Sequence, residues 1–439
     1  MDPTHTDPAD TLTPVRENQR IDSIDVLRGL ALLGIFVMNI PTFAFSYFAF
    51  FNPPAHGGFE GPDYWAWLGS HLFFEMKMMS IFSMLFGAGI VLFAQRIESK
   101  RGPGRAAGVH YRRMIWLLVF GMLHAYLIWY GDILVAYALV GMLAYLFRKL
   151  PPVILIFIAA MLLPIPPLIG IAQQFSLAHV QSEAQAGAEW AVEMWSEIGA
   201  TFYPESQELE AEHSAILGSY TDLVSHMAPH TAMMQTWVFL SWSLWRVLSM
   251  MLLGMVLFKY GVLSAKRSYN FYIAMFVISL LIGLPLILVG VNKMHTDNFD
   301  AIAFMGVNSA FNAFGSVVVA FAWIALIMLM CKAGALGWVR KALAAVGRMA
   351  FTNYIMQSLF GAVIFYGWGF GYFDQLSRSG LLLVVLMVWM FQIIFSLLWL
   401  TRYRMGPLEW LWRSLTYWRI EPIARSRPSE FSPEGGTGR

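Results

Sequence analysis

Apolar runs, broken by charge, proline and glycine, follow one another along most of the chain. Many of them reach roughly 18 residues or more, which as helix is enough to cross about 30 Å of hydrocarbon. We expect about ten such spans, at 25–43, 76–94, 114–130, 132–147, 152–172, 236–258, 271–291, 310–330, 349–370 and 381–400. The sequence therefore predicts an all-α fold, a polytopic membrane helix bundle.

A long polar interval divides the predicted spans into two groups of five. The interval, 173–235, has no Lys or Arg and carries nine acidic residues. We expect it to form short amphipathic helices on one side of the membrane. The predicted organisation is a polar N-terminal segment, a first helix group, the acidic interval, a second helix group and a polar tail, with boundaries at 1–23, 24–172, 173–235, 236–401 and 402–439.

Lys and Arg are placed asymmetrically along the chain. They gather after every second span, in the segments 96–113, 148–149, 259–267, 332–348 and 402–419, whereas the alternate loops hold only Lys293 and Arg378. Short loops rich in Lys and Arg stay in the cytoplasm. The pattern predicts that both termini are cytoplasmic and that the acidic interval is extracytoplasmic. The C-terminal tail beyond Arg425 is rich in Ser, Pro and Gly and is expected to be disordered.

Composition agrees with a membrane protein and excludes several other classes. Hydrophobic residues make up 58% of the 439 residues and charged residues 13%, against about 25% charged in a soluble domain. The net charge of +2 gives no indication of nucleic-acid binding. The single cysteine, Cys331, excludes an internal disulfide, and no metal site is predicted. Because the chain has no phosphate-binding loop motif, an ATP-driven pump is not expected.

His124 and Asp132 are a candidate catalytic pair. His124 lies roughly 17 Å into the third span by helical rise. Asp132 follows eight residues later, beyond Gly131, where the chain turns into the fourth span. A carboxylate beside a histidine can orient the ring as a base. The structural alternative is a neutral imidazole bonded to a neighbouring backbone, and both interpretations stay open.

Other polar side chains in the spans have structural and functional interpretations. Asp25, Arg28 and Asn39 share one face of the first span, where an Asp–Arg pair anchors a helix end and an amide bonds a neighbouring helix. Lys77 is expected to extend to the membrane surface. Arg246 lies too deep for that and is a candidate ligand for a carboxylate or phosphate.

Two amide-rich stripes recur at helical spacing in the second group. Asn308, Asn312 and Ser316 form the first stripe, and Asn353 and Gln357 form the second. Such stripes hold helices together or line a polar cavity, and the sequence does not separate the two.

Five stretches carry a resemblance to a known family: 25–40 (DVLRGLALLGIFVMNI), 77–89 (KMMSIFSMLFGAG), 121–134 (GMLHAYLIWYGDIL), 347–357 (GRMAFTNYIMQ) and 406–413 (GPLEWLWR). In this order they resemble the YeiB family of bacterial membrane proteins, over most of the chain from Asp25 to Tyr417. The resemblance implies a multi-pass protein of the bacterial cytoplasmic (inner) membrane. Members of this family are mostly uncharacterised and are often described as transporters.

The opening Asp-x-x-Arg-Gly-x-Ala is also similar to that of integral-membrane acyltransferases, including heparan-α-glucosaminide N-acetyltransferase. That likeness implies His124 as base, Asp132 as its orienting partner, and Asn39 or Asn353 as donors to the thioester oxyanion. Asn39 stands where the sugar O-acetylating enzymes have a histidine. The alternative bases are His56 and His71. The arginines implied for the phosphates of coenzyme A are Arg28, Arg112, Arg113 and Arg348.

The leading hypothesis is therefore transfer of an acyl group from cytoplasmic acyl-CoA to an extracytoplasmic or lipid-linked acceptor. No tightly bound cofactor is expected, and acyl-CoA is the implied cosubstrate. The expected partners are the bilayer and a small-molecule or lipid-linked acceptor, with a homo-oligomer left open. The alternatives are a carrier or flippase and a membrane protein that binds partners without chemistry. The predicted binding residues are Arg28, Lys77, Arg246, Arg348, Asn353, Tyr354 and Gln357.

Overall fold

The computed structural model describes residues 21–425, so the predicted tail beyond Arg425 and most of the 1–23 segment lie outside the described residues. Within 21–425 the chain is helical, with one isolated bridge between Tyr403 and Ala424 and no strand. The prediction of an all-α fold is confirmed. Seven helical segments are long and apolar enough to cross a membrane by length and composition. The count of ten spans and the cytoplasmic termini stay predictions.

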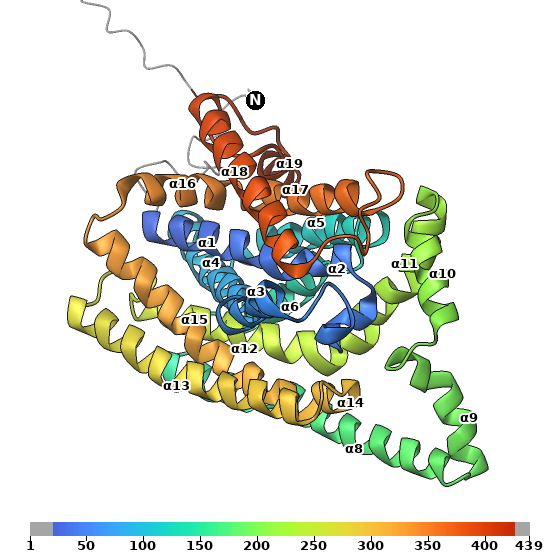
Figure 1. Ribbon diagram of the computed structural model, residues 1–439. Coiled ribbons are helices and arrows are strands. Elements are labelled where there is room, and N and C mark those ends of the chain that lie inside the picture. Colours follow the sequence, from blue (N-terminus) through green and yellow to red (C-terminus); the bar gives the residue numbers. More distant parts are fainter. Residues whose placement is uncertain (1–20, 426–439) are drawn as a thin grey trace, which may run out of the picture.

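The first helix group forms one side of the bundle and much of its centre (Figure 1). Its α-helices are α1 (Asp22–Asn39), α2 (Pro41–Ala44), α3 (Gly61–Phe73), α4 (Lys77–Arg101), α5 (Ala106–Leu127), α6 (Leu134–Phe147), α7 (Pro152–Leu162) and α8 (Ile165–Gln185). Two short 3-10 turns, η3 (Tyr47–Phe50) and η4 (Pro53–Ala55), lie between α2 and α3. Helix α8 continues beyond residue 172, where the acidic interval is predicted to begin.

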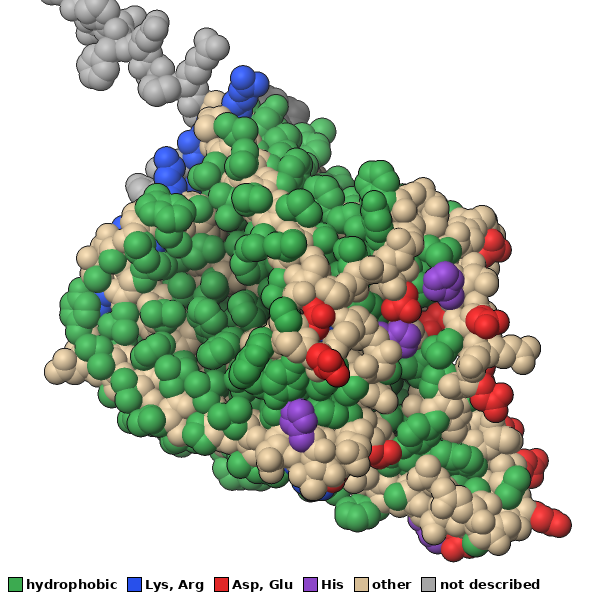
Figure 2. Space-filling view, viewed as in Figure 1, with side chains coloured by type: hydrophobic (Ala, Val, Ile, Leu, Met, Phe, Trp, Pro, Cys, Tyr) green, Lys and Arg blue, Asp and Glu red, His purple; other side chains and the backbone are tan. Residues whose placement is uncertain are grey.

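The acidic interval folds into helices, as predicted. They are α9 (Glu189–Ile198), η5 (Gly199–Thr201), α10 (Ser206–Ile216) and α11 (Tyr220–Met233). Figure 1 shows them projecting at one side of the bundle. Figure 2 shows Asp and Glu gathered on that side, whereas Lys and Arg lie at the opposite edge. We call these two sides the acidic end and the basic end.

The second helix group closes the bundle. Its elements are η6 (Met234–Ser243), α12 (Leu244–Lys259), α13 (Tyr269–Thr296), α14 (Ala301–Ala303), η7 (Phe304–Asn308), α15 (Ser309–Lys332), α16 (Gly337–Arg348), α17 (Ala350–Phe365), α18 (Arg378–Arg402) and α19 (Pro407–Tyr417). Elements η6 and η7 are π-helical. Helices α12 and α15 lie inside, whereas α13 and α18 expose most of their surface.

The centre of the bundle depends on a close crossing of α4 and α12. A Cβ atom on Gly254 would lie 1.8 Å from the carbonyl oxygen of Met84, and one on Gly87 would lie 2.0 Å from that of Met251. Small residues let helix backbones approach closely in membranes, where packing replaces the hydrophobic effect as the main source of association. The crossing brings the polar side chains of α4 and α12 together in the interior.

A break between α3 and α4 places Lys77 inside the bundle. Met76 has a φ of 61°, and α4 begins at the next residue. The break frees backbone carbonyls in the last turn of α3, and such groups need partners where no water is present. Lys77 Nζ donates to the carbonyl oxygen of His71 at 2.5 Å. The expectation that Lys77 extends to the membrane surface is wrong, because the side chain is fully buried.

Candidate functional site

His124 and Asp132, the candidate pair, form a buried dyad. His124 Nδ1 lies 2.7 Å from Asp132 Oδ2, and the two side chains are 1% and 2% exposed. His124 lies in the last turn of α5, and Asp132 lies in the turn before α6. With Asp132 ionised, Nδ1 of His124 carries the proton and donates a hydrogen bond to the carboxylate. The other ring nitrogen, Nε2, then has a free lone pair and is the basic atom of the ring.

The carboxylate of Asp132 is held from a second direction. Its Oδ1 accepts the backbone N–H of Val135 at 2.8 Å, in the first turn of α6. The positive end of the helix dipole favours a negative charge at this place. Tyr354 of α17 supports the same turn, because its hydroxyl accepts the N–H of Ile133 at 3.2 Å. The Tyr354 ring also packs on the His124 ring, with 5.2 Å between the centroids.

His124 lines an apolar groove between α5 and α17. Nε2 is buried and has no hydrogen-bond partner within residues 21–425. The groove has a volume of about 420 Å³. Its lining residues are Phe120, Leu123, His124, Leu127, Ile128, Tyr220, Phe351, Ile355, Leu359, Trp368 and Leu408. We call this feature the α5–α17 groove, and its position beside an unpaired imidazole nitrogen makes it the candidate reaction site.

A second buried cluster contains two cations, at the crossing of α4, α12 and α15. Lys77 Nζ donates to Asn312 Oδ1 at 2.6 Å. One turn further along α4 and α15, the guanidinium of Arg246 donates to Ser80 Oγ at 2.9 Å and to Ser316 Oγ at 2.7 Å. We call these five residues the Lys77–Arg246 ladder. The hydrogen bond between Lys77 and Asn312 connects α4 to α15. Arg246, which belongs to α12, connects that helix to both α4 and α15.

The amide stripe of α17 connects three helices. Asn353 Nδ2 donates to Ser396 Oγ at 3.0 Å, and Gln357 Nε2 donates to Gln392 Oε1 at 3.1 Å. Gln392 Nε2 in turn donates to the carbonyl oxygen of Asn353 at 2.8 Å. Gln357 also reaches the carbonyl oxygen of Leu32 in α1. These contacts join α1, α17 and α18, and they place the Asn353 amide on the α18 side of α17, away from the groove-lining residues.

The predicted arginines gather at the basic end, around α16 and α19. Arg28 forms an ion pair with Asp25 at 2.7 Å and also donates to the carbonyl oxygen of Gly347, next to Arg348. Arg113 lies over the Trp412 ring of α19, with its Cζ 4.4 Å from the ring centroid. Asn39, by contrast, ends α1 near the acidic end. Its side chain makes no hydrogen bond within residues 21–425, and nothing brings it to the dyad.

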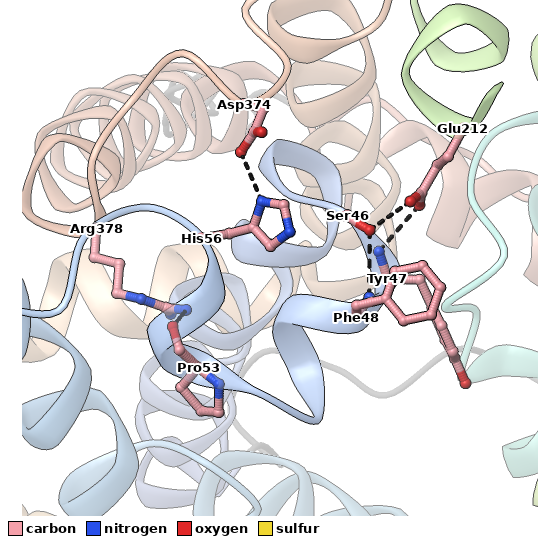
Figure 3. Close-up of polar contacts among 8 residues, drawn as sticks. All are labelled: Ser46, Tyr47, Phe48, Pro53, His56, Glu212, Asp374 and Arg378. Carbon is pink, nitrogen blue, oxygen red and sulfur yellow. Dashed lines mark hydrogen bonds and ion pairs between the residues drawn. The ribbon is translucent and has the colours of Figure 1, made fainter. Parts of the chain in front are cut away.

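The two alternative histidines also have carboxylate partners. At the acidic end His56 Nδ1 lies 3.2 Å from Asp374 Oδ1 (Figure 3). His71 Nδ1 lies 2.5 Å from Glu75 Oε2, beneath the Lys77–Arg246 ladder. A carboxylate partner alone therefore does not single out His124, because three histidines have one. Only His124 among the three lines the α5–α17 groove.

The same view shows Glu212, a residue that no pattern in the sequence singles out (Figure 3). Glu212 of α10 is buried, accepts a hydrogen bond from Ser46 Oγ and accepts the N–H of Tyr47 at 3.0 Å. It is one of nine acidic residues in its interval, and no spacing distinguishes it from the others. No group of three His, Cys, Asp or Glu side chains in the described part of the chain is placed to hold a metal ion.

Comparison with known proteins places the chain in a family. Residues 257–419 match the family model described as "Protein of unknown function (DUF418)". The chain is similar to Uncharacterized protein YxaH of Bacillus subtilis, with 29% identity over 94% of this chain and 98% of that protein. It is 30% identical to Uncharacterized protein YeiB of Escherichia coli, over 91% of this chain and 96% of that protein. No solved structure matches the chain. The predicted resemblance to the YeiB family is confirmed, and the chain belongs to the YeiB (DUF418) family of membrane proteins.

Proposed function

We propose that the protein transfers an acyl group from acyl-CoA to an acceptor hydroxyl or amine, with His124 as the general base. The observation that supports this most directly is the pairing at His124. One ring nitrogen is held by the carboxylate of Asp132 at 2.7 Å, the other is buried and unpaired, and the ring lines the α5–α17 groove. A base with its orienting partner beside a place for an acceptor is the arrangement that acyl transfer needs.

The proposed step for a hydroxyl acceptor balances without further reactants. Nε2 of His124 takes the proton of the acceptor hydroxyl as its oxygen attacks the thioester carbonyl carbon. The new carbon–oxygen bond forms and the carbon–sulfur bond breaks. The proton on Nε2 then passes to the departing thiolate, which leaves as coenzyme A. Asp132 stays ionised throughout and stabilises the charged imidazolium that exists between the two proton transfers.

Two further groups are suited to this step. Tyr354 accepts the Ile133 N–H, and its own hydroxyl proton has no acceptor within residues 21–425, so it can donate to the oxyanion of the tetrahedral intermediate. Arg28 and Arg113 at the basic end are suited to the phosphates of coenzyme A. On the predicted orientation the basic end faces the cytoplasm of a bacterial inner membrane, where acyl-CoA is present.

The test is turnover of radiolabelled acetyl-CoA by purified protein in lipid nanodiscs. We expect His124→Ala to lower label transfer or thioester hydrolysis by about 10²–10⁴-fold, because general base catalysis contributes about this much. His179→Ala, at an exposed histidine of α8, is the matched control and should leave turnover unchanged. Equal turnover in wild type and His124→Ala, or no binding of acetyl-CoA by well-folded wild type, would refute the proposal.

A carrier or flippase is the second candidate function. The observation in its favour is the set of interrupted helices near the Lys77–Arg246 ladder: the break before Lys77 and the π-helical η6 and η7. Discontinuous helices line the substrate sites of many transporters. Uptake of a labelled solute into proteoliposomes that depends on Arg246, together with no acyl-CoA turnover, would favour this function over the first.

A further inference from the structure

The walls of the α5–α17 groove limit what can occupy it. None of its eleven lining residues is Lys, Arg, Asp or Glu. Its flanking side chains are exposed, with Leu123 at 53% and Leu359 at 44%. In a membrane-spanning bundle such side chains face hydrocarbon, because no water is present to solvate the rest of the span. The groove is therefore open along its side to the hydrocarbon of the bilayer, and its occupant is a molecule that the bilayer holds.

The two ends of the groove differ in chemistry. Leu408 of α19 closes the end nearer the basic side of the bundle. Tyr220 of α11 and Trp368 lie at the other end, where the Tyr220 hydroxyl donates to the carbonyl oxygen of Leu127 at 2.7 Å. Tyr and Trp are the side chains that occupy the boundary between headgroups and hydrocarbon. One end is thus wholly apolar, and the other is suited to the polar part of a lipid.

His124 lies close to the polar end of the groove. It is three residues before Leu127, the last residue of α5, so its ring is roughly 5 Å below the end of the helix. With the headgroup at Tyr220 and Trp368, the lipid group beside His124 is the one that joins the hydrocarbon chain to the headgroup. The unpaired Nε2 therefore meets the linking region of a lipid rather than the middle of its chain.

We propose that the acceptor is a lipid with a free hydroxyl at the boundary between its hydrocarbon chain and its headgroup. The chain lies along the groove from His124 towards Leu408, and the headgroup lies at Tyr220 and Trp368. The hydroxyl donates to Nε2 of His124, which satisfies the buried nitrogen that has no partner in the protein. The reactivity of this hydroxyl rests on the proposed acyl transfer, but its binding does not.

The chain and the hydroxyl contribute differently to recognition. A hydrocarbon chain that moves from the bilayer into an apolar groove exchanges one apolar surrounding for another, so it gains little. The hydroxyl gains a hydrogen bond to an imidazole that would otherwise stay unpaired. Selection among membrane lipids therefore depends on the hydroxyl and its depth, whereas the chain sets the orientation.

The test uses a long-chain alcohol with a photoactivatable diazirine in its chain, added to the protein in phosphatidylcholine nanodiscs. Crosslinked peptides are mapped by mass spectrometry. We expect labelling to concentrate on residues 120–128 and 351–359, and to fall several-fold with excess unlabelled alcohol but not with the matching alkane. Leu123→Trp and Leu359→Trp fill the groove and should each lower the labelling several-fold. Leu281→Trp, on the exposed face of α13, is the matched control and should not lower the labelling.

The outcomes separate this inference from the proposed function. Labelling spread over all lipid-facing helices in proportion to exposure, or unaffected by both groove-filling variants in folded protein, would overturn the lipid site. Saturable groove labelling without acyl transfer would leave the lipid site in place and remove the transferase. Acyl transfer to a water-soluble acceptor that Leu123→Trp does not diminish would keep the transferase and remove the lipid site. Folding of each variant is checked by its thermal unfolding midpoint.

Discussion

Two of the polar clusters buried in the molecule, the Lys77–Arg246 ladder and the His124–Asp132 dyad, differ in the kind of group that the protein leaves unpaired. In the Lys77–Arg246 ladder, Lys77 donates to two protein oxygens, and both terminal nitrogens of Arg246 donate to oxygens of α4 and α15. The atoms of the ladder without a partner within residues 21–425 are the N–H donors Arg246 Nε and Asn312 Nδ2. In the His124–Asp132 dyad, one of the two ring nitrogens has no partner within residues 21–425, and the ring lines the α5–α17 groove. The ladder has more charge, but the dyad has a basic atom left for a substrate.

This difference changes how buried charge in a membrane should be interpreted. An ionisable residue inside a span is by default a functional candidate. By that rule Arg246 outranks His124. The kind of unpaired atom reverses the order. The ladder uses its paired donors to join α4, α12 and α15 and leaves only N–H donors unpaired, whereas the dyad leaves a basic nitrogen unpaired on a ring that lines a groove. We therefore infer that the ladder stabilises the fold and that the dyad takes part in the reaction. Each of the following experiments can contradict this inference.

The largest effect on folding is expected from Arg246→Ala. The change removes three hydrogen bonds and leaves a cavity where one of the largest fully buried side chains stood. We expect the free energy of unfolding to fall by about 3 kcal/mol or more. Thermal unfolding in detergent, followed by tryptophan fluorescence, measures it. Acyl transfer per folded molecule should be unchanged, and a variant that folds normally but loses all activity would make the ladder the functional cluster.

A smaller effect is expected from Asp132→Ala, and it should fall on the reaction. The change removes the hydrogen-bond acceptor of His124 Nδ1 and the negative charge that stabilises the imidazolium. We expect acyl transfer to fall by about a hundredfold, or about 2.7 kcal/mol of barrier, and less than for His124→Ala. The assay is the radiolabelled turnover in nanodiscs. If Asp132→Ala proved as severe as His124→Ala while the protein stayed folded, the carboxylate would do more than orient the ring.

Tyr354→Phe should have the smallest effect of the series. The phenyl ring keeps its packing on His124, but the hydroxyl that accepts the Ile133 N–H and is free to donate to the oxyanion is gone. We expect about a tenfold lower turnover number, equivalent to about 1.4 kcal/mol of barrier. The Michaelis constant for acetyl-CoA should change little, because a group that acts on the oxyanion acts in the transition state. A raised Michaelis constant with unchanged turnover would assign Tyr354 to substrate binding instead.

Part of this picture follows from the sequence. The apolar runs predict helices because each must satisfy its own backbone in hydrocarbon. The proximity of His124 and Asp132 also follows from the sequence, since Gly131 and the polar Asp132 lie in the turn between two helices, which returns the carboxylate to His124. The pair is local, and eight residues of sequence contain the information.

The remaining features depend on contacts between distant segments. Lys77 is interior because the chain breaks at Met76, and no proline or glycine marks that break. The α5–α17 groove combines side chains from four helices and two loops, from Phe120 to Leu408. Each of these side chains alone looks like any other membrane-facing apolar residue. A hollow between helices has no pattern along one chain, so neither the groove nor its position beside Nε2 could be predicted.

The contact between Glu212 and the turn at Ser46 has a consequence for how the protein is made. The two residues are 166 positions apart, with α3 to α9 between them. A ribosome adds about 5–20 residues per second, so the turn waits for its carboxylate partner for roughly ten to thirty seconds after it is synthesised. During that time the backbone N–H of Tyr47 and the hydroxyl of Ser46 must find other partners. The acidic end therefore acquires its final shape late in synthesis, when α10 reaches a bundle whose first helices are already in place.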